Sequence, residues 1–339
     1  MFIPYKVVFD EKVLQYALGT ELLKRFKESD IEVLVNKGGR VLGKRDDSDA
    51  KNFFLGKRTL VIGVRKITEF QSCKPSANYQ LPLLSGCSGM CEYCYLNTQL
   101  GKRPYTKIYV NVDEILNKAF KYVEERKPEK TVFEGAATSD PIPTEKYTGA
   151  LRKTIERIGE NEFSYFRFVT KFSEIDSLIG VKHNGHTTIR FSLNTNKIID
   201  EFEKGTDSFE ERVNAAKKLY NDGYKIGFII APVFLYDEWK DDYLKLISKI
   251  SEEFSNAEEG REIEIEVISH RYTERAKNQI LTVYPKSKLP MDKDGRSLKY
   301  GQFGYTKYVY DKENIKEMKE FFEENLRKYM NKCIIKYII

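Results

Sequence analysis

Strand-like and helix-like segments alternate from residue 81 onward, and this alternation constrains the fold more than any other feature of the chain. Six short apolar segments have the length and composition of buried strands, and helical patterns separate most of them. Such a repeat predicts parallel strands joined by right-handed crossovers. About six strands are too few to close an eight-stranded barrel, so we predict an open, partial barrel. The strand candidates are residues 81–84, 130–135, 165–170, 187–193, 225–232 and 263–269, and the helix candidates are residues 112–126, 144–158, 208–223 and 243–254.

Both ends of the chain depart from this alternation. We therefore expect an α/β fold in three parts: a small N-terminal α/β lobe at residues 1–75, a partial (β/α)6 TIM-like barrel at 76–270, and a C-terminal part at 271–339. Residues 296–312 alternate aromatic and basic side chains around glycines, which predicts a C-terminal β-hairpin. The other elements expected at the two ends are a helix at 11–29, strands at 31–35 and 58–64, an exposed loop at 36–52, a helix at 314–330 and a strand at 333–339.

The composition is that of an ordinary globular protein. Of the 339 residues, 57 are basic and 51 are acidic, so the formal net charge is +6, a balance that permits a nucleic-acid partner without requiring one. We find no N-terminal signal peptide and no run of about 18 apolar residues. Five cysteines, three of them clustered, do not resemble a secreted disulfide framework. We therefore expect a cytoplasmic protein without membrane contact.

Three of the five cysteines, Cys87, Cys91 and Cys94, follow one another with three and then two residues between them. A structural zinc site normally has four Cys or His ligands, and the remaining Cys and His residues form no second pair of ligands. A 4Fe–4S cluster takes cysteine thiolates as ligands, and three thiolates leave one iron open for a small molecule. The pattern favours such a cluster, with a zinc site and three unrelated buried cysteines as the alternatives.

The cysteine segment, with Tyr93 before the last cysteine, resembles the signature of the radical S-adenosylmethionine (SAM) enzymes. The sequence that follows Cys91, together with FEGAATSD, RFVTKF, RFSLNT and GYTKYVY, resembles the spore photoproduct lyase family over nearly the whole chain. The resemblance implies that Cys87, Cys91 and Cys94 hold three irons and that SAM binds the fourth. It also implies a 5′-deoxyadenosyl radical that abstracts a hydrogen atom from a methylene-bridged thymine dimer in DNA.

The resemblance also implies SAM contacts. Lys171 is similar to the lysine that pairs with the SAM carboxylate, and Ser139 and Ser192 are similar to the polar contacts of SAM. Ala231 occupies a position where the family backbone meets the adenosine, and Tyr93 is a further cofactor contact. Without the resemblance, a lysine at a strand end is more often solvated, and the serines could be helix caps.

Two tyrosines and one departure from the family concern catalysis. Tyr93 and Tyr95 match family tyrosines beside the lesion, with core packing as the alternative. Ala137 stands where family members usually carry a cysteine that returns a hydrogen atom to the product radical. Alanine has no hydrogen to transfer, so this position is either an engineered vacancy or a natural variant with its donor elsewhere. Cys73 is the candidate donor, with a buried loop cysteine as the alternative, and Cys333 is expected to pack in a terminal strand.

The expected hairpin carries the DNA-contact candidates Lys299, Tyr300, Tyr305 and Lys307. An enzyme that acts on a base must extrude it from the stack. Proteins that unstack duplexes insert a wedge while basic residues hold the backbone. Cations and aromatic side chains on one hairpin suit this task, whereas the alternative is an ordinary edge hairpin whose lysines prevent aggregation.

From the resemblance we predict a radical SAM carbon–carbon lyase that repairs spore photoproduct in the cytoplasm of the spore core. The expected cofactors are a 4Fe–4S cluster and SAM. The expected partners are DNA that contains the thymine dimer lesion and an external electron donor of the flavodoxin or ferredoxin type, and a monomer is expected. Two alternatives stay open: a radical SAM enzyme that acts on another nucleic acid or a peptide, and a metal-stabilised nucleic-acid-binding module without catalysis.

Overall fold

The computed structural model describes residues 2–37, 41, 48–101, 104–255, 261–300, 306–330 and 333–339. The chain forms two compact units. Unit 1 comprises Met1–Met90, Gln99–Thr170 and Glu174–Thr188, and unit 2 comprises Cys91–Thr98, Lys171–Ser173 and Ile189–Ile339. The division expected at residues 1–75, 76–270 and 271–339 stays a prediction. Within the described ranges, no helix is long and apolar enough to cross a membrane.

Unit 1 contains a five-stranded sheet with four parallel strands and one antiparallel edge strand. In spatial order its strands are β2 (Glu32–Asn36), β1 (Lys6–Asp10), β3 (Thr59–Gly63), β8 (Thr106–Tyr109) and the antiparallel β6 (Leu84–Ser85). Every residue of β3 is buried, as its continuous apolar sequence predicts for a central parallel strand. Helices α1 (Ala17–Lys27) and α2 (Asp49–Lys57) belong to the same unit.

Two N-terminal elements differ from the sequence expectation. The helix expected at 11–29 is a 3-10 helix, η1 (Glu11–Gln15), followed by α1, because Tyr16 between them has an extended backbone. The loop expected at 36–52 includes the start of α2, whose N-cap Ser48 accepts a backbone hydrogen bond. The first turn of α2 is polar, so its sequence resembles a loop until its cap is recognised.

The remaining strands of unit 1 are parallel apart from one short edge strand. In spatial order they are β10 (Ser164–Thr170), β9 (Thr131–Glu134), β5 (Ala77–Gln80) and the antiparallel β4 (Ser72–Cys73). The helical elements of this part are α4 (Val112–Arg126), α5 (Ile142–Thr148), α6 (Ala150–Gly159) and the 3-10 helix η2 (Asp176–Leu178).

Proline and glycine account for two differences in this part of unit 1. Of the strand expected at 81–84, only Leu84 lies in a strand, β6, and the strand that pairs with β9 is β5; Pro82 cannot donate a hydrogen bond in the interior of a strand. The helix expected at 144–158 is divided into α5 and α6. Gly149 between them adopts the left-handed region, with φ of 59°, which ends one helix before the next begins.

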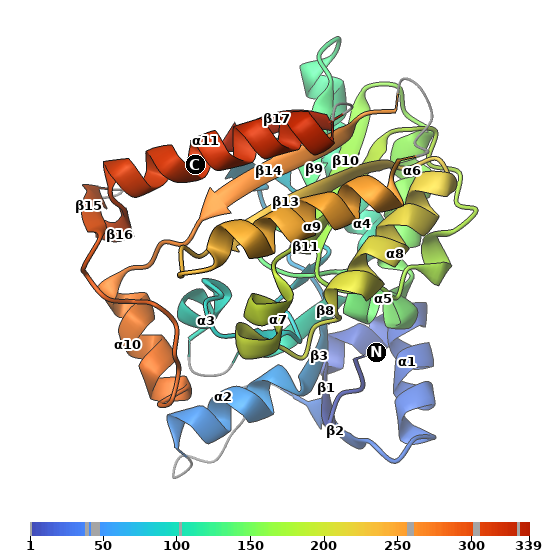
Figure 1. Cartoon of the computed structure of the whole chain (residues 1–339). Helices are drawn as coiled ribbons and strands as arrows, with labels where there is room; N and C mark the ends of the chain where they lie inside the picture. Colours follow the sequence, from blue (N-terminus) through green and yellow to red (C-terminus); the bar gives the residue numbers. More distant parts are fainter. Residues whose placement is uncertain are drawn as a thin grey trace. The chain divides into compact units, whose positions relative to one another are not determined.

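Unit 2 contains the other long parallel strands. In spatial order these are β17 (Cys333–Ile338), β14 (Ile263–Ser269), β13 (Lys225–Val233) and β11 (Thr187–Leu193), of which the residues from Ile189 belong to unit 2. Helices α9 (Trp239–Glu253) and α11 (Lys312–Tyr329) run beside these strands (Figure 1). The other elements are α7 (Asn196–Phe202), the short strand β12 (Glu203–Lys204), α8 (Phe209–Asn221) and α10 (Glu274–Val283).

The expected C-terminal hairpin is present in unit 2. Its strands β15 (Arg296–Tyr300) and β16 (Thr306–Tyr310) pair antiparallel, and Lys299 lies directly opposite Lys307. The DNA-contact candidate Tyr305 lies outside the described residues.

Stacked rings lie between the core of unit 2 and the base of the hairpin. His270 stacks on Phe234 with 4.5 Å between ring centroids, and Tyr272 stacks on Tyr308 at 5.1 Å. Arg296 donates to the His270 carbonyl at 2.7 Å and contacts its Nδ1 at 3.2 Å. Because arginine only donates, Nδ1 accepts and the proton of the neutral ring is on Nε2. Burial, reinforced by two nearby arginines, lowers the pKa of His270 to about 3.

We predict that His270 makes the folded protein less stable in mild acid. Its pKa in the unfolded chain is about 6.5, so below that pH the unfolded state binds a proton that the folded state refuses. Stability therefore falls as the pH is lowered toward about 3, with a loss of about 2 kcal/mol already at pH 5. Urea unfolding of wild type and His270→Gln at pH 5 and pH 7 measures this. The substitution should remove most of the pH-dependent difference, and equal differences in both proteins would contradict the prediction.

Candidate active site

Cys87 lies in a loop of unit 1 that buried polar contacts hold in place. Gly86 forms a parallel bridge with Ser139, so the loop begins beside a predicted SAM contact. Only glycine fits there, because φ is +82° and a Cβ would lie 2.3 Å from a backbone carbonyl oxygen. The Lys57 side chain donates to the carbonyls of Cys87 (3.1 Å) and Gly89 (2.8 Å), although Lys57 is only 1% exposed. These hydrogen bonds offset part of the free-energy cost of burying the Lys57 ammonium group, and they fix the backbone of the cysteine loop.

Cys91 and Cys94 are neighbours in unit 2. Cys91 ends the short strand β7 (Met90–Cys91), and the Cys94 N–H donates to its carbonyl at 3.2 Å. The buried side chain of Asn97, in the short helix α3 (Leu96–Gln99), donates to the same carbonyl at 3.0 Å. The backbone that carries these two thiols is thus fixed by hydrogen bonds within its own segment.

The three cysteines fit an iron–sulfur cluster by their chemistry. Cys87, Cys91 and Cys94 are not joined in disulfides, so their sulfurs can serve as the thiolate ligands that a cluster takes. Among the residues that the structure describes, no three Cys, His, Asp or Glu side chains converge as a ready-made metal site. The assignment of the three thiols as iron ligands therefore stays a prediction.

Unit 1 has a pocket of about 250 Å³ beside the segment that departs from the family pattern. Ala137 and Ser139 line it, with Glu134 from the end of β9 and Gln71 from the segment before β4. Cys73, two residues beyond Gln71, is partly exposed and is not one of the lining residues. The structure therefore brings Ala137 and Ser139 to one pocket and leaves Cys73 on the strand pair β4–β5 next to β9.

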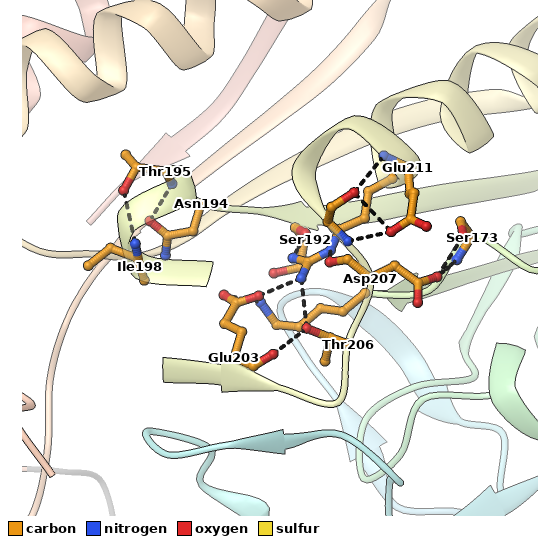
Figure 2. A network of polar contacts seen from close by, with 12 residues as sticks. Ser173, Ser192, Asn194, Thr195, Ile198, Glu203, Thr206, Asp207 and Glu211 are labelled. Atoms are coloured by element: carbon orange, nitrogen blue, oxygen red, sulfur yellow. Dashed lines mark hydrogen bonds and ion pairs between the residues drawn. The ribbon is translucent and has the colours of Figure 1, made fainter. Parts of the chain in front are cut away.

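Tyr93, Lys171 and Ser192, three of the predicted residues, meet in unit 2 around the buried ion pair of Glu203 with Arg212. Figure 2 shows Ser192 and Glu203 in this network. Lys171 Nζ donates to the Tyr93 hydroxyl at 3.0 Å and to Glu203 Oε1 at 2.8 Å. The Tyr93 hydroxyl in turn donates to Glu203. Arg212 forms an ion pair with Glu203 Oε2 at 2.7 Å and donates to the Ser192 carbonyl at 2.9 Å. Each of the three predicted residues is thus within one contact of Glu203 or Arg212.

The charges of this network determine its protonation. Burial alone would raise the pKa of Glu203, but the charges of Lys171 and Arg212 outweigh it and lower that pKa. Burial and the adjacent Glu203 carboxylate raise the pKa of Tyr93 well above its ordinary value. At neutral pH, Glu203 is therefore a carboxylate and Tyr93 keeps the proton that it donates.

The other predicted residues of unit 2 lie at strand ends or on the surface. Ala231 lies near the end of β13, and the carbonyl of Pro232 after it accepts a hydrogen bond from Asn194 at 2.8 Å. Tyr95 is 54% exposed, so core packing does not describe it. Tyr93, in contrast, also packs against the apolar cluster that includes Phe234.

Our reading of the sequence missed Lys57, Glu203 and Arg212. The available signal was in α8, where Arg212 falls three residues after the buried Phe209 and four before the buried Ala216. This is the spacing of a core-facing position. A charged residue at such a position requires a buried partner.

Two like charges face each other across the hairpin. Lys299 lies opposite Lys307, an arrangement that destabilises a strand pair unless an anion offsets it. Burial, followed by the charges of Arg271 and Lys299, lowers the pKa of Lys307. Leu298 and Tyr300 on the same strand are 54% and 78% exposed. Because side chains alternate along a strand, the two lysines lie on one face of the hairpin and Leu298 and Tyr300 on the other. The cations suit phosphates of a nucleic acid, and the exposed aromatic side chain suits a base.

The chain is similar over its whole length to proteins of one family. The family model described as "Spore photoproduct lyase" matches residues 2–339. A spore photoproduct lyase of Clostridium acetobutylicum is 54% identical over 334 residues, which cover 98% of this chain and 98% of that protein. A spore photoproduct lyase of Bacillus subtilis is 39% identical over 340 residues, which cover 99% of this chain and 98% of that protein.

Solved structures agree with this similarity. One is a spore photoproduct lyase double mutant, with one cysteine changed to alanine and one serine to cysteine, with bound AdoMet and dinucleoside spore photoproduct. It is 39% identical with a TM-score of 0.94, and the match covers 100% of this chain and 99% of that chain. A spore photoproduct lyase complexed with dinucleoside spore photoproduct gives the same TM-score at 38% identity and the same coverage. The expected fold class, an α/β fold with a partial barrel, is confirmed.

Proposed function

The chain belongs to the spore photoproduct lyase family, and we propose that it repairs spore photoproduct, a methylene-bridged thymine dimer in DNA, as a radical SAM lyase. The family expected from the sequence is confirmed. One observation carries the proposal: the match at residues 2–339 includes the cysteine segment, the pocket beside Ala137 and the network around Lys171. The cofactor and substrate that we propose are those bound in a solved relative.

We assign the cofactor contacts by charge and chemistry. Cys87, Cys91 and Cys94 supply thiolates for three irons of a 4Fe–4S cluster, and SAM binds the fourth. When bound, the cluster and SAM supply a 5′-deoxyadenosyl radical that removes a hydrogen atom from the lesion. Lys171 offers its ammonium group to the SAM carboxylate, a charge-assisted contact of the strong kind.

The other contacts follow from position in the fold. Ser192 and Ala231 lie at or near the carboxyl ends of parallel strands, where ligands bind in α/β sheets. Ser139 lines the pocket of unit 1 and is offered as a polar contact. We assign Tyr93 and Tyr95 to positions beside the lesion. Tyr93 keeps its proton and orients Lys171, whereas Tyr95 is exposed enough to contact a substrate.

We propose that Cys73 returns the hydrogen atom that a cysteine at the position of Ala137 would otherwise return. The thiol transfers hydrogen from sulfur to the thymine carbon radical and leaves the unpaired electron on sulfur. Support comes from the double mutant of the solved relative, whose two exchanged positions are separated by the same number of residues as Cys73 and Ala137. β4, which carries Cys73, pairs with β5, and β5 pairs with β9, so a single strand separates Cys73 from the strand that ends just before Ala137. This favours a natural variant over an engineered vacancy.

The proposed partners follow from the same chemistry. Lys299, Tyr300, Tyr305 and Lys307 are assigned to contacts with DNA around the lesion. An external protein of the flavodoxin or ferredoxin type is proposed as the electron donor, because cluster chemistry needs an electron from outside the chain. We propose that the protein acts as a monomer in the spore core, where its substrate forms.

The cluster assignment predicts a sharp difference between two cysteine variants. Cys91→Ala should lose SAM cleavage with dithionite as reductant, because two thiolates retain a cluster poorly. Cys333→Ala is the matched control, since this half-buried cysteine lies in β17, and it should cleave SAM like wild type. Iron and sulfide analysis after anaerobic reconstitution should give about four of each in wild type. One zinc without sulfide in wild type, or full cleavage by Cys91→Ala, would refute the assignment.

The donor assignment predicts a change in products rather than in rate of SAM cleavage. Cys73→Ala should still open the lesion, but the thymine radical should then yield trapped adducts in place of the repaired dinucleotide. Adding Ala137→Cys to this variant should restore clean repair, because a thiol again lines the pocket. Chromatography of products from a dinucleoside substrate measures both. A normal product distribution from Cys73→Ala would show that another group is the donor.

The hairpin assignment predicts a change in the salt dependence of DNA binding. Lys299→Ala combined with Lys307→Ala should weaken binding and lower the slope of log affinity against log salt by about 2, because two phosphate contacts are lost. The control is Lys312→Ala combined with Lys316→Ala, which removes the same charge from exposed positions of α11. An unchanged slope in the hairpin variant, or an equal change in the control, would count against contact between the hairpin and phosphate.

A further inference from the structure

We infer that Glu203, held by Arg212, is a positioning residue that keeps Lys171 and Tyr93 in place to receive the carboxylate of SAM. The inference rests on the proposed function, because it takes Lys171 as the carboxylate contact. It adds two residues to the site, neither of which carries a predicted role, and it gives them a task that can be measured by ligand binding.

The burial and contacts of Glu203 are the first support. Its side chain is 0% exposed, and it receives contacts from Lys171, Tyr93 and Arg212. Removing an ionised carboxylate from water is unfavourable unless partners compensate it, so the position of this carboxylate and the positions of its partners depend on one another. Lys171 is flexible and loses rotamer freedom when it is fixed. A buried acceptor at 2.8 Å fixes it before any ligand arrives.

The contacts of Arg212 are the second support. Its guanidinium donates to the carbonyls of Ser192 and Asp207, each at 2.9 Å, and to Thr206 Oγ1 at 2.8 Å. Arg212 is itself fully buried, so it has a single arrangement in which all these contacts are made. Arg212 therefore links Glu203 to the backbone at the end of β11, and Glu203 in turn holds Lys171.

In Glu203→Gln, the loss of a negative charge and the loss of Lys171 positioning change SAM affinity in opposite directions. Glu203→Gln removes a negative charge, and on charge alone the site should then attract the SAM carboxylate more strongly. Arg212 and Lys171 both only donate hydrogen bonds, so an amide cannot satisfy both at once: its oxygen faces one and its NH2 group faces the other. If Glu203 positions Lys171, the variant should bind SAM more weakly despite the gain in positive charge.

The test compares two ligands of the anaerobically reconstituted enzyme by equilibrium dialysis. SAM has the carboxylate, whereas 5′-methylthioadenosine keeps the adenosine and the sulfur but has no amino acid portion. We expect Glu203→Gln to weaken SAM about tenfold, the effect of losing a charged hydrogen bond, and to change methylthioadenosine less than about twofold. Glu203→Asp keeps the charge but is too short for all three contacts, and it should also weaken SAM selectively.

Two further variants make the outcomes distinguishable. Glu266→Gln is the matched control, because Glu266 is a buried carboxylate that contacts Arg190 at 3.3 Å and accepts from the Tyr337 hydroxyl. It should leave the ratio of the two affinities unchanged. Lys171→Met should weaken SAM selectively, and if it does not, the carboxylate contact in the proposed function is wrong. If Lys171→Met weakens SAM while both Glu203 variants bind it like wild type or more tightly, the positioning role is wrong and the proposed function stands.

Discussion

The ion pair between Glu203 and Arg212 is the interaction on which the buried polar contacts of Lys171, Tyr93 and Ser192 depend. Both side chains are fully buried, with 2.7 Å between Arg212 Nη2 and Glu203 Oε2. Breaking such a pair leaves an uncompensated buried charge, which is more costly than never having buried it. The capping box of Ser208 and Glu211 fixes the residue at which α8 begins. Arg212 lies in the first turn of this helix, so the capping box also fixes the position of its side chain in the core. The start of α8, the end of β11 and the position of Lys171 therefore depend on one another through Arg212 and Glu203.

Local pattern was enough to predict most of the regular elements. The strands expected at 187–193 and 263–269 have those bounds in the structure, and so does the helix expected at 112–126. These segments have strong apolar periodicity, and packing agrees with their local preference. The failures lie where one residue overrides the periodicity. Gly149 divides a predicted helix, and Pro82 lies inside a predicted strand that the structure replaces by β5 before it and the two-residue β6 after it.

The candidate site was predicted less completely, because its decisive contacts join residues that are distant in sequence. Lys171 and Ser192 were identified by family resemblance, which selects single positions and not their partners. Glu203 lies 32 residues from Lys171 and 110 from Tyr93, and Lys57 lies 30 residues before Cys87. No periodicity connects such pairs. Only a charge at a core-facing position, as at Arg212, indicates that a partner exists, and it does not say where.

Different parts of the hairpin hold it to unit 2 and carry its positive charge. Its first residue, Arg296, stacks over Tyr310 with 3.6 Å to the ring centroid and donates to His270, so the base is fixed by contacts within unit 2. Further along, Lys299 and Lys307 face each other without gaining stability from the pairing. The base therefore contributes to folding, and the paired lysines contribute a repulsion that a phosphate can relieve. The hairpin therefore favours binding of an anion, but its folding does not depend on that anion.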